Sequence, residues 1–433
     1  MEFVYFYFNN FLTFAGNWWF FLLPFFLYPP MKSMWIYDLY ARHFVNEKYT
    51  ILSIKVPKEL ETGPSLMENV IHGIWNIFGE TKHFMHTYCQ GVFDDYISLE
   101  IVGVGGKIYY GIWVRAEKAG MIKTHLYANY PDCEIEELDY SNDYMHYIPD
   151  NIPNEEWDMW GAKFTLAKPD IYPLNTYPKF EDEFSKGMSD PIASYLEMVG
   201  STVPGEFCCF QLLIEPVRAV DTWREEFDQE IEKILDRGNY KKPYSIKDDL
   251  IDHFGTLPMD TINAVFKYPE YVPSEDEKEQ MQKAALMFRL SPGEQETIKE
   301  IERSLEKKTF KSQYSFVYVA KKNVIDYGKY VGGLFGATNQ LSSEELNGFE
   351  PYYPYMTSSK YFLEKNRLNF IKRRLIRITK NRQFQGADYY FNTEEIATLW
   401  HFPYIWVKTP ETPWVEAKKA TPPLNLPTSK ENI

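Results

Sequence analysis

The chain has 433 residues, which is enough for two or three domains with sizeable hydrophobic cores. Aromatic residues make up 17% of it, led by 33 Tyr and 31 Phe, so we expect thick aromatic cores or contact surfaces. The net charge of −15 argues against non-specific nucleic-acid binding by the whole molecule, although it leaves room for a local basic patch. Four cysteines without a CxxC spacing indicate neither a disulfide framework nor a zinc site.

The first part of the chain predicts a membrane anchor. From Phe3 to Met31 there are 29 residues without a charge, and about 20 apolar residues span the core of a bilayer. We therefore expect a transmembrane helix in residues 11–30; the alternative is a buried aromatic core helix. The residues expected to lie in the membrane are Trp18, Trp19, Phe20, Phe21, Leu22, Leu23, Phe25, Phe26 and Leu27.

Charges around this stretch predict its orientation. Only Glu2 precedes it, whereas Lys32, Arg42 and Lys48 follow it. The positive-inside rule then places the N-terminus outside and the rest of the chain in the cytoplasm. The expected localisation is the inner (cytoplasmic) membrane, with residues 1–47 as a single-pass anchor and juxtamembrane segment.

Residues 48–150 predict a first ferredoxin-like α+β domain. The expected elements are a strand in 49–59, a helix in 65–78, a hairpin of strands 95–104 and 107–116, a helix in 118–131 and a strand in 132–140. This β-α-β-β-α-β order is the split β-α-β arrangement.

Residues 151–403 predict a second, looser version of the same unit. The expected strands are 162–170, 205–216, 311–322 and 388–392, and the expected helices are 190–200, 221–238, 291–307, 324–343 and 361–382. Residues 239–290 are expected to form an insertion, and residues 404–433 a Pro-rich linker or tail. The predicted fold class is α+β, with a transmembrane helix followed by two ferredoxin-like units, which could be a duplication.

The last periodic segment, "YYFNTEEIATLWHFP" (389–403), predicts a strand, a helix N-cap, one apolar helical face and a proline stop.

Catalytic motifs are absent from the sequence. The P-loop pattern GxxxxGK[ST], GxSxG and HExxH do not occur. His83, His86 and Cys89 could share a helical face, but a metal site needs a fourth ligand, so surface histidines are the favoured interpretation. A hydrolase would need acids such as Asp95 and Glu100, with Asp94, to converge in a pocket. We therefore expect a non-enzyme without cofactor or metal.

A basic helix is the strongest local signal. Residues 360–382 carry nine Lys and Arg residues against Glu364 alone, in an acidic protein. Such a helix is either a solvated basic face or a contact surface for DNA phosphates, anionic lipid headgroups or an acidic partner. The predicted contact residues are Lys365, Arg367, Lys372, Arg373, Arg374, Arg377, Lys380 and Arg382.

Several strings in this order resemble one protein family. They include "YISLEIVGVGGKIYYGIW" (96–113), "WGAKFTLAKPDIYPLNTY" (160–177), "LSPGEQETIKEIERS" (290–304) and "YYFNTEEIATLWHFP" (389–403). Over residues 20–427 the chain resembles the non-motor region that precedes the ATPase in type IV secretion and conjugation coupling-protein ATPases of candidate-phyla bacteria. None of the strings is a catalytic motif.

In that family a Pro-rich link, similar to "ATPPLNLP" (420–427), leads into a P-loop motor that moves DNA. Here no motor follows, so either the sequence is a fragment, the ATPase is encoded separately, or the chain is a stand-alone relative. The resemblance implies a membrane-anchored, non-catalytic platform for an ATPase, assembled with copies of itself, with the C-terminal tail and the Trp400–Pro403 region contacting or tethering the motor. The alternative is a membrane-bound scaffold or binding protein unrelated to DNA transfer.

Overall fold

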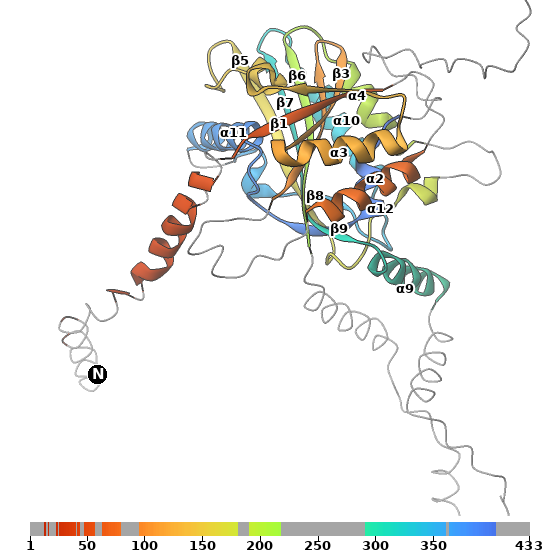
Figure 1. The fold of residues 1–433 in the computed structure, drawn as a ribbon. Helices are drawn as coiled ribbons and strands as arrows, with labels where there is room; N and C mark the ends of the chain where they lie inside the picture. The colour runs from red at the N-terminus through yellow and green to blue at the C-terminus, as the bar shows by residue number, and fades with distance from the viewer. Residues whose placement is uncertain are drawn as a thin grey trace, which may run out of the picture.

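A nine-stranded antiparallel sheet forms the centre of the molecule (Figure 1). The structure, a computed structural model, describes residues 13, 16, 23–24, 26–39, 41–43, 47–56, 63–78, 95–180, 190–217, 291–360 and 363–403. The strands follow the order β4-β1-β3-β2-β6-β7-β5-β8, and β9 pairs with β7. The coarse prediction of a mixed α+β fold is confirmed.

The first half of the sheet has the element order expected from the sequence. Its elements are β1 (Tyr49–Lys55), α2 (Pro64–Ile77), β2 (Ile97–Val104), β3 (Lys107–Arg115), α3 (Ala116–Asn129) and β4 (Glu134–Leu138). The β2–β3 hairpin turns at Gly105 and Gly106, whose φ angles of 55° and 90° are costly for residues with a Cβ. Glycine is therefore favoured at this turn.

The second half supplies the remaining strands and helices. These are β5 (Trp157–Leu166), α4 (Ala193–Gly200), β6 (Glu206–Pro216), α9 (Pro292–Leu305), β7 (Thr309–Lys321), α10 (Tyr327–Gln340), β8 (Phe349–Pro351), α11 (Glu364–Lys380), β9 (Tyr389–Asn392) and α12 (Thr393–Leu399).

Some boundaries in this half differ from the prediction. Strand β5 begins at Trp157, not at residue 162, and β8 was not predicted. Helix α4 begins after Ile192, because Asp190 binds the Ile192 amide in a preceding turn and does not act as the helix N-cap. The expected helix 221–238 and insertion 239–290 lie outside the described residues.

The two halves share one sheet. Strand β2 pairs with β6 along its whole length, from Ile97 opposite Ile214 to Val104 opposite Phe207. The domain boundary at residue 150 stays a prediction, but hydrogen bonds between strands cross from one half to the other.

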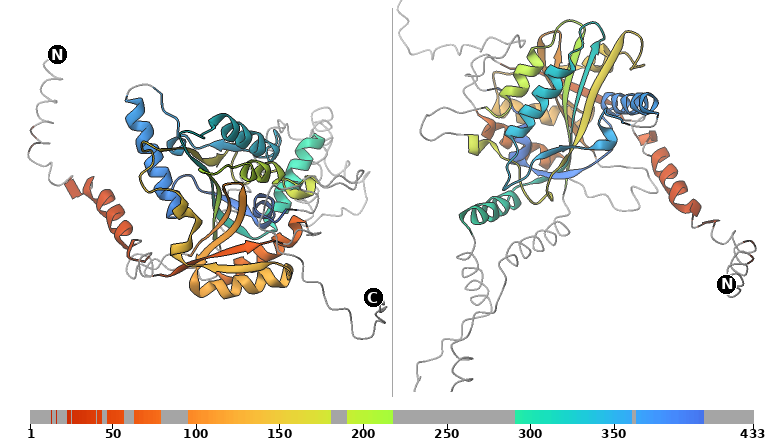
Figure 2. Two further views of the ribbon diagram at one scale, coloured as in Figure 1. Left: turned by 90° about the horizontal axis from the view of Figure 1, so that it is seen from above. Right: turned by 180° about the vertical axis from the view of Figure 1, so that it is seen from behind.

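Alternating residues divide the core between the two faces of the sheet. On β7, Phe316 and Tyr318 belong to the large cluster that includes α2, α3, α4, α10 and α12, whereas Val317 and Val319 belong to a smaller cluster with α11. Figure 2 shows α11 across the sheet from α4 and α10. Helix α11 therefore has a face of the sheet largely to itself.

The segment 389–403 belongs to the larger cluster. Asn392 and Glu395 make the expected capping box of α12, so the predicted strand, N-cap and helix are confirmed. Trp400 and Phe402 are 2% and 1% exposed, and both rings pack on Tyr110. The expectation that Trp400–Pro403 contacts an ATPase is wrong, because these residues lie in the core.

The predicted transmembrane helix is not supported by the described residues. Within the described parts of the chain, no helix has both the length and the apolar character needed to cross a membrane. Of the predicted anchor, Leu23, Phe26 and Leu27 are described and helical. Trp18, Trp19, Phe20, Phe21, Leu22 and Phe25 lie outside the described residues.

Candidate partner-binding surface

Helix α11 is seated closely on β5. An added Cβ at Gly161 would lie 2.8 Å from Leu375 Cδ2 and 2.8 Å from the Phe316 carbonyl oxygen, so only glycine leaves room for the helix. Leu375, with Ile376 and Ile378, is buried against the sheet. This close contact fixes which side of α11 faces outward.

Two lysines of the predicted contact set are held on the inner side of α11. Lys372 Nζ lies 2.6 Å from Asp158 Oδ1, and its side chain is 8% exposed. Burial alone would raise the pKa of Asp158, but the hydrogen bond and charge of Lys372 hold it below its usual value. Lys380 Nζ lies 2.5 Å from Asp150 Oδ1, and this hydrogen bond lowers the pKa of Asp150. Lys372 is therefore not positioned to meet a partner, whereas Lys380 pairs with an aspartate whose side chain is 91% exposed.

Arg382 follows α11 and is buried. Its guanidinium donates to both oxygens of Glu100 (2.8 and 3.0 Å) and both oxygens of Asp143 (2.7 and 3.1 Å). Gln211 and Ser98 also donate to Glu100, so this buried carboxylate is fully hydrogen-bonded. The prediction that Arg382 contacts a partner is wrong, because the side chain is 3% exposed.

Arg374 lies between these buried cations and the solvent. Its guanidinium carbon is 4.3 Å from the centroid of the Tyr355 ring, and it donates a hydrogen bond to the Tyr355 hydroxyl. This cation–π contact orients the side chain along the surface.

The remaining predicted contact residues are exposed. They are Lys365, Arg367, Arg373 and Arg377. Among the residues that the structure describes, none of the four forms an ion pair with a carboxylate. Arg367, Phe370, Arg373 and Arg377 follow one another at spacings of three and four residues, so they share one helical face, and Phe370 is 66% exposed. We call Arg367, Phe370, Arg373 and Arg377 the arginine stripe.

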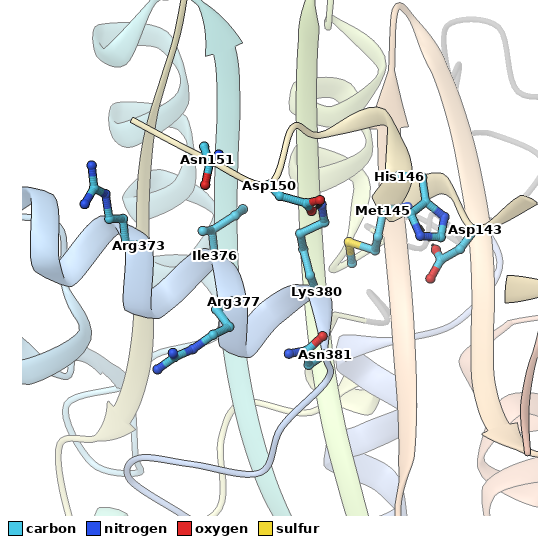
Figure 3. A pocket seen from close by; sticks show the side chains of 10 residues that line it. All are labelled: Asp143, Met145, His146, Asp150, Asn151, Arg373, Ile376, Arg377, Lys380 and Asn381. Carbon is cyan, nitrogen blue, oxygen red and sulfur yellow. Dashed lines mark hydrogen bonds and ion pairs between the residues drawn. The ribbon is translucent and has the colours of Figure 1, made fainter. Parts of the chain in front are cut away.

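A hollow of about 420 Å³ runs beside the C-terminal half of α11. It is lined by Asp143, Met145, His146, Asp150, Asn151, Arg373, Ile376, Arg377, Lys380 and Asn381. Figure 3 shows Arg373 and Arg377 at one end, His146 and Asp143 at the other, and Ile376 between them. The amides of Asn151 and Asn381 can bind polar groups, and the two guanidinium groups suit a phosphate or carboxylate.

Two of the acids that a hydrolase would need, Asp95 and Glu100, pair with separate groups of basic side chains. Asp95 lies 2.9 Å from Lys118 Nζ and 3.3 Å from Arg115, whereas Glu100 is bound by Arg382. The described residues contain no group of three or more His, Cys, Asp or Glu side chains that could hold a metal ion. Asp94, His83, His86 and Cys89 lie outside the described residues.

One buried cation was missed by the sequence analysis. Lys163 on β5 is 2% exposed, and its ammonium group donates to Gln313 Oε1 (2.9 Å) and to the Gln385 carbonyl oxygen (2.5 Å). Burial, with a smaller contribution from the charge of Arg374, lowers the pKa of Lys163 to about 7. The only sign in the sequence is that Lys163 stands between Ala162 and Phe164 in an expected strand, which places it on the other face of the sheet from them. In the structure this is the face that α11 covers.

Comparison with protein families gives one match. A family model described as a domain of unknown function (DUF8128) matches residues 40–282, which is more than half of the chain. A search of curated proteins finds no match. The matched region includes β1 to β6 and ends before α9 and α11.

Proposed function

The chain belongs to the DUF8128 family, and we propose that it is a membrane-anchored, non-catalytic component of a type IV secretion or conjugation-like system that translocates DNA or protein. In this proposal it serves as an assembly platform for a separately encoded P-loop ATPase. Support comes from the resemblance in motif order and from the surface of α11, whereas the family description adds no activity.

The arginine stripe is the observation that carries the proposal. Helix α11 pairs Lys372 with the part-buried Asp158 and Lys380 with the exposed Asp150, and it presents Arg367, Arg373 and Arg377 to the solvent. Arginine binds phosphate and carboxylate through two parallel hydrogen bonds and stacks on planar groups, which lysine cannot do. A helix face that only contacts water does not require this difference between paired lysines and exposed arginines. We therefore infer that the arginine stripe contacts an anionic partner.

We further infer that the sheet consists of two ferredoxin-like units related by duplication. The first half runs β4-β1-β3-β2, and the second runs β6-β7-β5-β8. When the strands of each half are numbered 1 to 4 along the chain, the sheet order is 4-1-3-2 in the first half and 2-3-1-4 in the second. Read outward from the β2–β6 pair, both halves therefore have the order 2-3-1-4. Each half also carries a helix before its second strand and another before its fourth.

Membrane anchoring and self-association remain part of the proposal. The uncharged stretch from Phe3 to Met31 supports an anchor in the inner membrane, with the sheet in the cytoplasm. The resemblance supports assembly with further copies of the chain.

The test uses charge reversal on the stripe. Arg373→Glu with Arg377→Glu changes two exposed side chains, and Lys107→Glu with Lys299→Glu, on β3 and α9, is a control with the same change in charge. Each full-length variant is pulled down from membrane extracts, its partners are identified by mass spectrometry, and its DNA affinity is measured by fluorescence anisotropy. We expect the stripe variant to lose the bound ATPase or DNA and the control to keep it.

Unchanged binding in the stripe variant would rule out the role given to α11. A wild-type preparation that contains neither ATPase nor DNA would favour the second candidate, a membrane-bound scaffold that holds another protein. The observation that favours this candidate is exposed aromatic surface on one side of the sheet, where Tyr353 is 77% and Phe370 is 66% exposed.

A further inference from the structure

The hollow beside α11 collects polar side chains that the protein itself does not use. Arg373, Arg377, Asn151 and Asn381 line it, and in the described parts of the chain none of these four side chains makes a hydrogen bond or an ion pair. Both arginines come from α11, Asn381 follows the last residue of this helix, and Asn151 comes from the segment before β5. Polar groups from two separate segments therefore meet in one hollow and are available to a ligand.

The other charges of the hollow are already paired. Lys380 Nζ lies 2.5 Å from Asp150 Oδ1, and Asp143 accepts two hydrogen bonds from Arg382. The two exposed guanidinium groups of α11 are therefore the cations of the hollow that no described carboxylate balances. A ligand that brings negatively charged oxygens to this end of the hollow gains charge-assisted hydrogen bonds.

An apolar floor lies between the polar groups. Met145 and Ile376 are each 2% exposed, and the small part of each that remains accessible lines the hollow. Figure 3 shows Ile376 between the end of the hollow with the two arginines and the end with His146. A ligand that fills the hollow therefore has an uncharged part next to its anionic groups.

We propose that the hollow binds an extended acidic segment of a partner protein. Carboxylates of the segment bind Arg373 and Arg377, and its backbone lies over Ile376 and forms hydrogen bonds with the amides of Asn151 and Asn381. This inference rests on the partner-binding role proposed above for the arginine stripe. It names protein, and not nucleic acid, as the partner.

The two amides favour a peptide over a nucleic-acid backbone. An Asn side chain has two N–H donors and one carbonyl acceptor, and a peptide group has an N–H and a C=O that match them. A phosphodiester backbone offers acceptors alone, so it would leave the amide oxygens of Asn151 and Asn381 unused.

The charges around the hollow give the same preference. The side chain of Asp150 is 91% exposed at the hollow, and the whole chain has a net charge of −15. A continuous polyanion would be repelled by these charges on either side of its binding site. A short acidic segment places its charges at the two arginines alone.

The spacing of the two arginines matches that of alternate residues in an extended peptide. Arg373 and Arg377 are four residues apart on α11, which is about 6 Å along the helix axis. Side chains two residues apart in an extended segment point to the same side and are separated by about 6.6 Å. We therefore expect the bound segment to contain two acidic residues with one residue between them.

The test compares three probes on the full-length protein in a non-ionic detergent. The acidic probe is a short fluorescein-labelled peptide with the core Glu-Leu-Glu, and the reference probe has Gln-Leu-Gln in its place. The third probe is single-stranded DNA with the same label. Fluorescence anisotropy gives the Kd of each probe, and we expect the acidic probe to bind at least about tenfold more tightly than the reference probe.

Two variants locate the bound peptide. Arg377→Gln removes one unbalanced charge and Asn151→Ala removes one amide; both side chains are exposed, so the fold should tolerate the changes. Lys299→Gln on α9 is the control, with the same change in charge outside the hollow. We expect the Kd of the acidic probe to rise at least about tenfold in Arg377→Gln and about threefold in Asn151→Ala, and less than about twofold in the control.

Four results would overturn the inference. Equal affinities for the two peptides would show that the hollow does not select carboxylates. An acidic probe that binds both hollow variants as tightly as the wild type would lie elsewhere on the surface. DNA binding that Arg377→Gln abolishes, without binding of the acidic probe, would make nucleic acid the partner, while the proposed role of the arginine stripe stands. If neither peptide nor DNA binds, the inference is refuted, and the pull-down described above decides the role of the stripe by itself.

Discussion

Replacing Arg382 tests whether the buried network beneath α11 is as tightly coupled as its geometry indicates. The substitution Arg382→Ala removes four hydrogen bonds and leaves Glu100 and Asp143 facing each other without a cation. Both carboxylate side chains are at most 3% exposed, so they are largely removed from water in the folded protein.

The expected loss of stability follows from this burial. Removing one partner of a buried ion pair costs about 3–5 kcal/mol, because a desolvated charge remains without compensation. Here two carboxylates lose the same partner, so we expect the upper part of that range. Arg382→Lys keeps the charge but not the bidentate hydrogen bonds, so it should lower the stability less than Arg382→Ala does.

Urea unfolding of the full-length protein in mild detergent, followed by tryptophan fluorescence, measures the effect. The control is Arg377→Ala, an exposed arginine on α11, which should change the free energy of unfolding by about 0.5 kcal/mol or less. If Arg382→Ala costs less than about 1 kcal/mol, the network is not the desolvated ion cluster described here.

Three further predictions concern the packing around α11 and α12. Because the pKa of Lys163 is lowered to about 7, the folded state binds fewer protons than the unfolded state between pH 7 and about pH 10, so stability should rise with pH there, by up to about 1.4 kcal/mol per unit. In urea melts across this window, Lys163→Met should reduce that slope; an equal slope in both proteins would contradict it. Gly161→Val should force α11 off β5 and lower the unfolding midpoint by at least the equivalent of about 2 kcal/mol, whereas an unchanged midpoint would show that the helix tolerates the shift. Trp400→Ala should lower the free energy of unfolding by about 3–5 kcal/mol in the same assay. A change near zero would contradict the buried position of Trp400.

Much of the fold was predictable because local signals coincide with the final structure. The β2–β3 hairpin has its glycine turn, α9 has the Ser291–Glu294 capping box, and α12 has the Asn392–Glu395 box. Each of these signals acts over four residues or fewer, so the sequence shows it directly. Short β8 has no such signal; it exists because β5 offers it an edge to pair with.

The candidate surface was predictable only in part, because composition does not say which partner a charged side chain meets. Nine cations in 360–382 predicted a basic surface, but Lys372 and Arg382 pair with Asp158 and Glu100, which are far away in the sequence. A helical wheel would place Lys372 on the inner face, since it lies three residues before Leu375 and four residues before Ile376. It could not identify Asp158, which depends on the tertiary structure.

Residues 389–403 complete the core although they come last among the described elements. The indole of Trp400 donates to the backbone oxygen of Glu100, 300 residues earlier. At about 5–20 residues per second, a ribosome needs on the order of tens of seconds to cover that distance. During that time the nascent first half has Tyr110 and Tyr130 without the aromatic rings that cover them in the folded protein. We therefore expect fragments that end before residue 403 to aggregate when expressed, because they leave this part of the core uncovered.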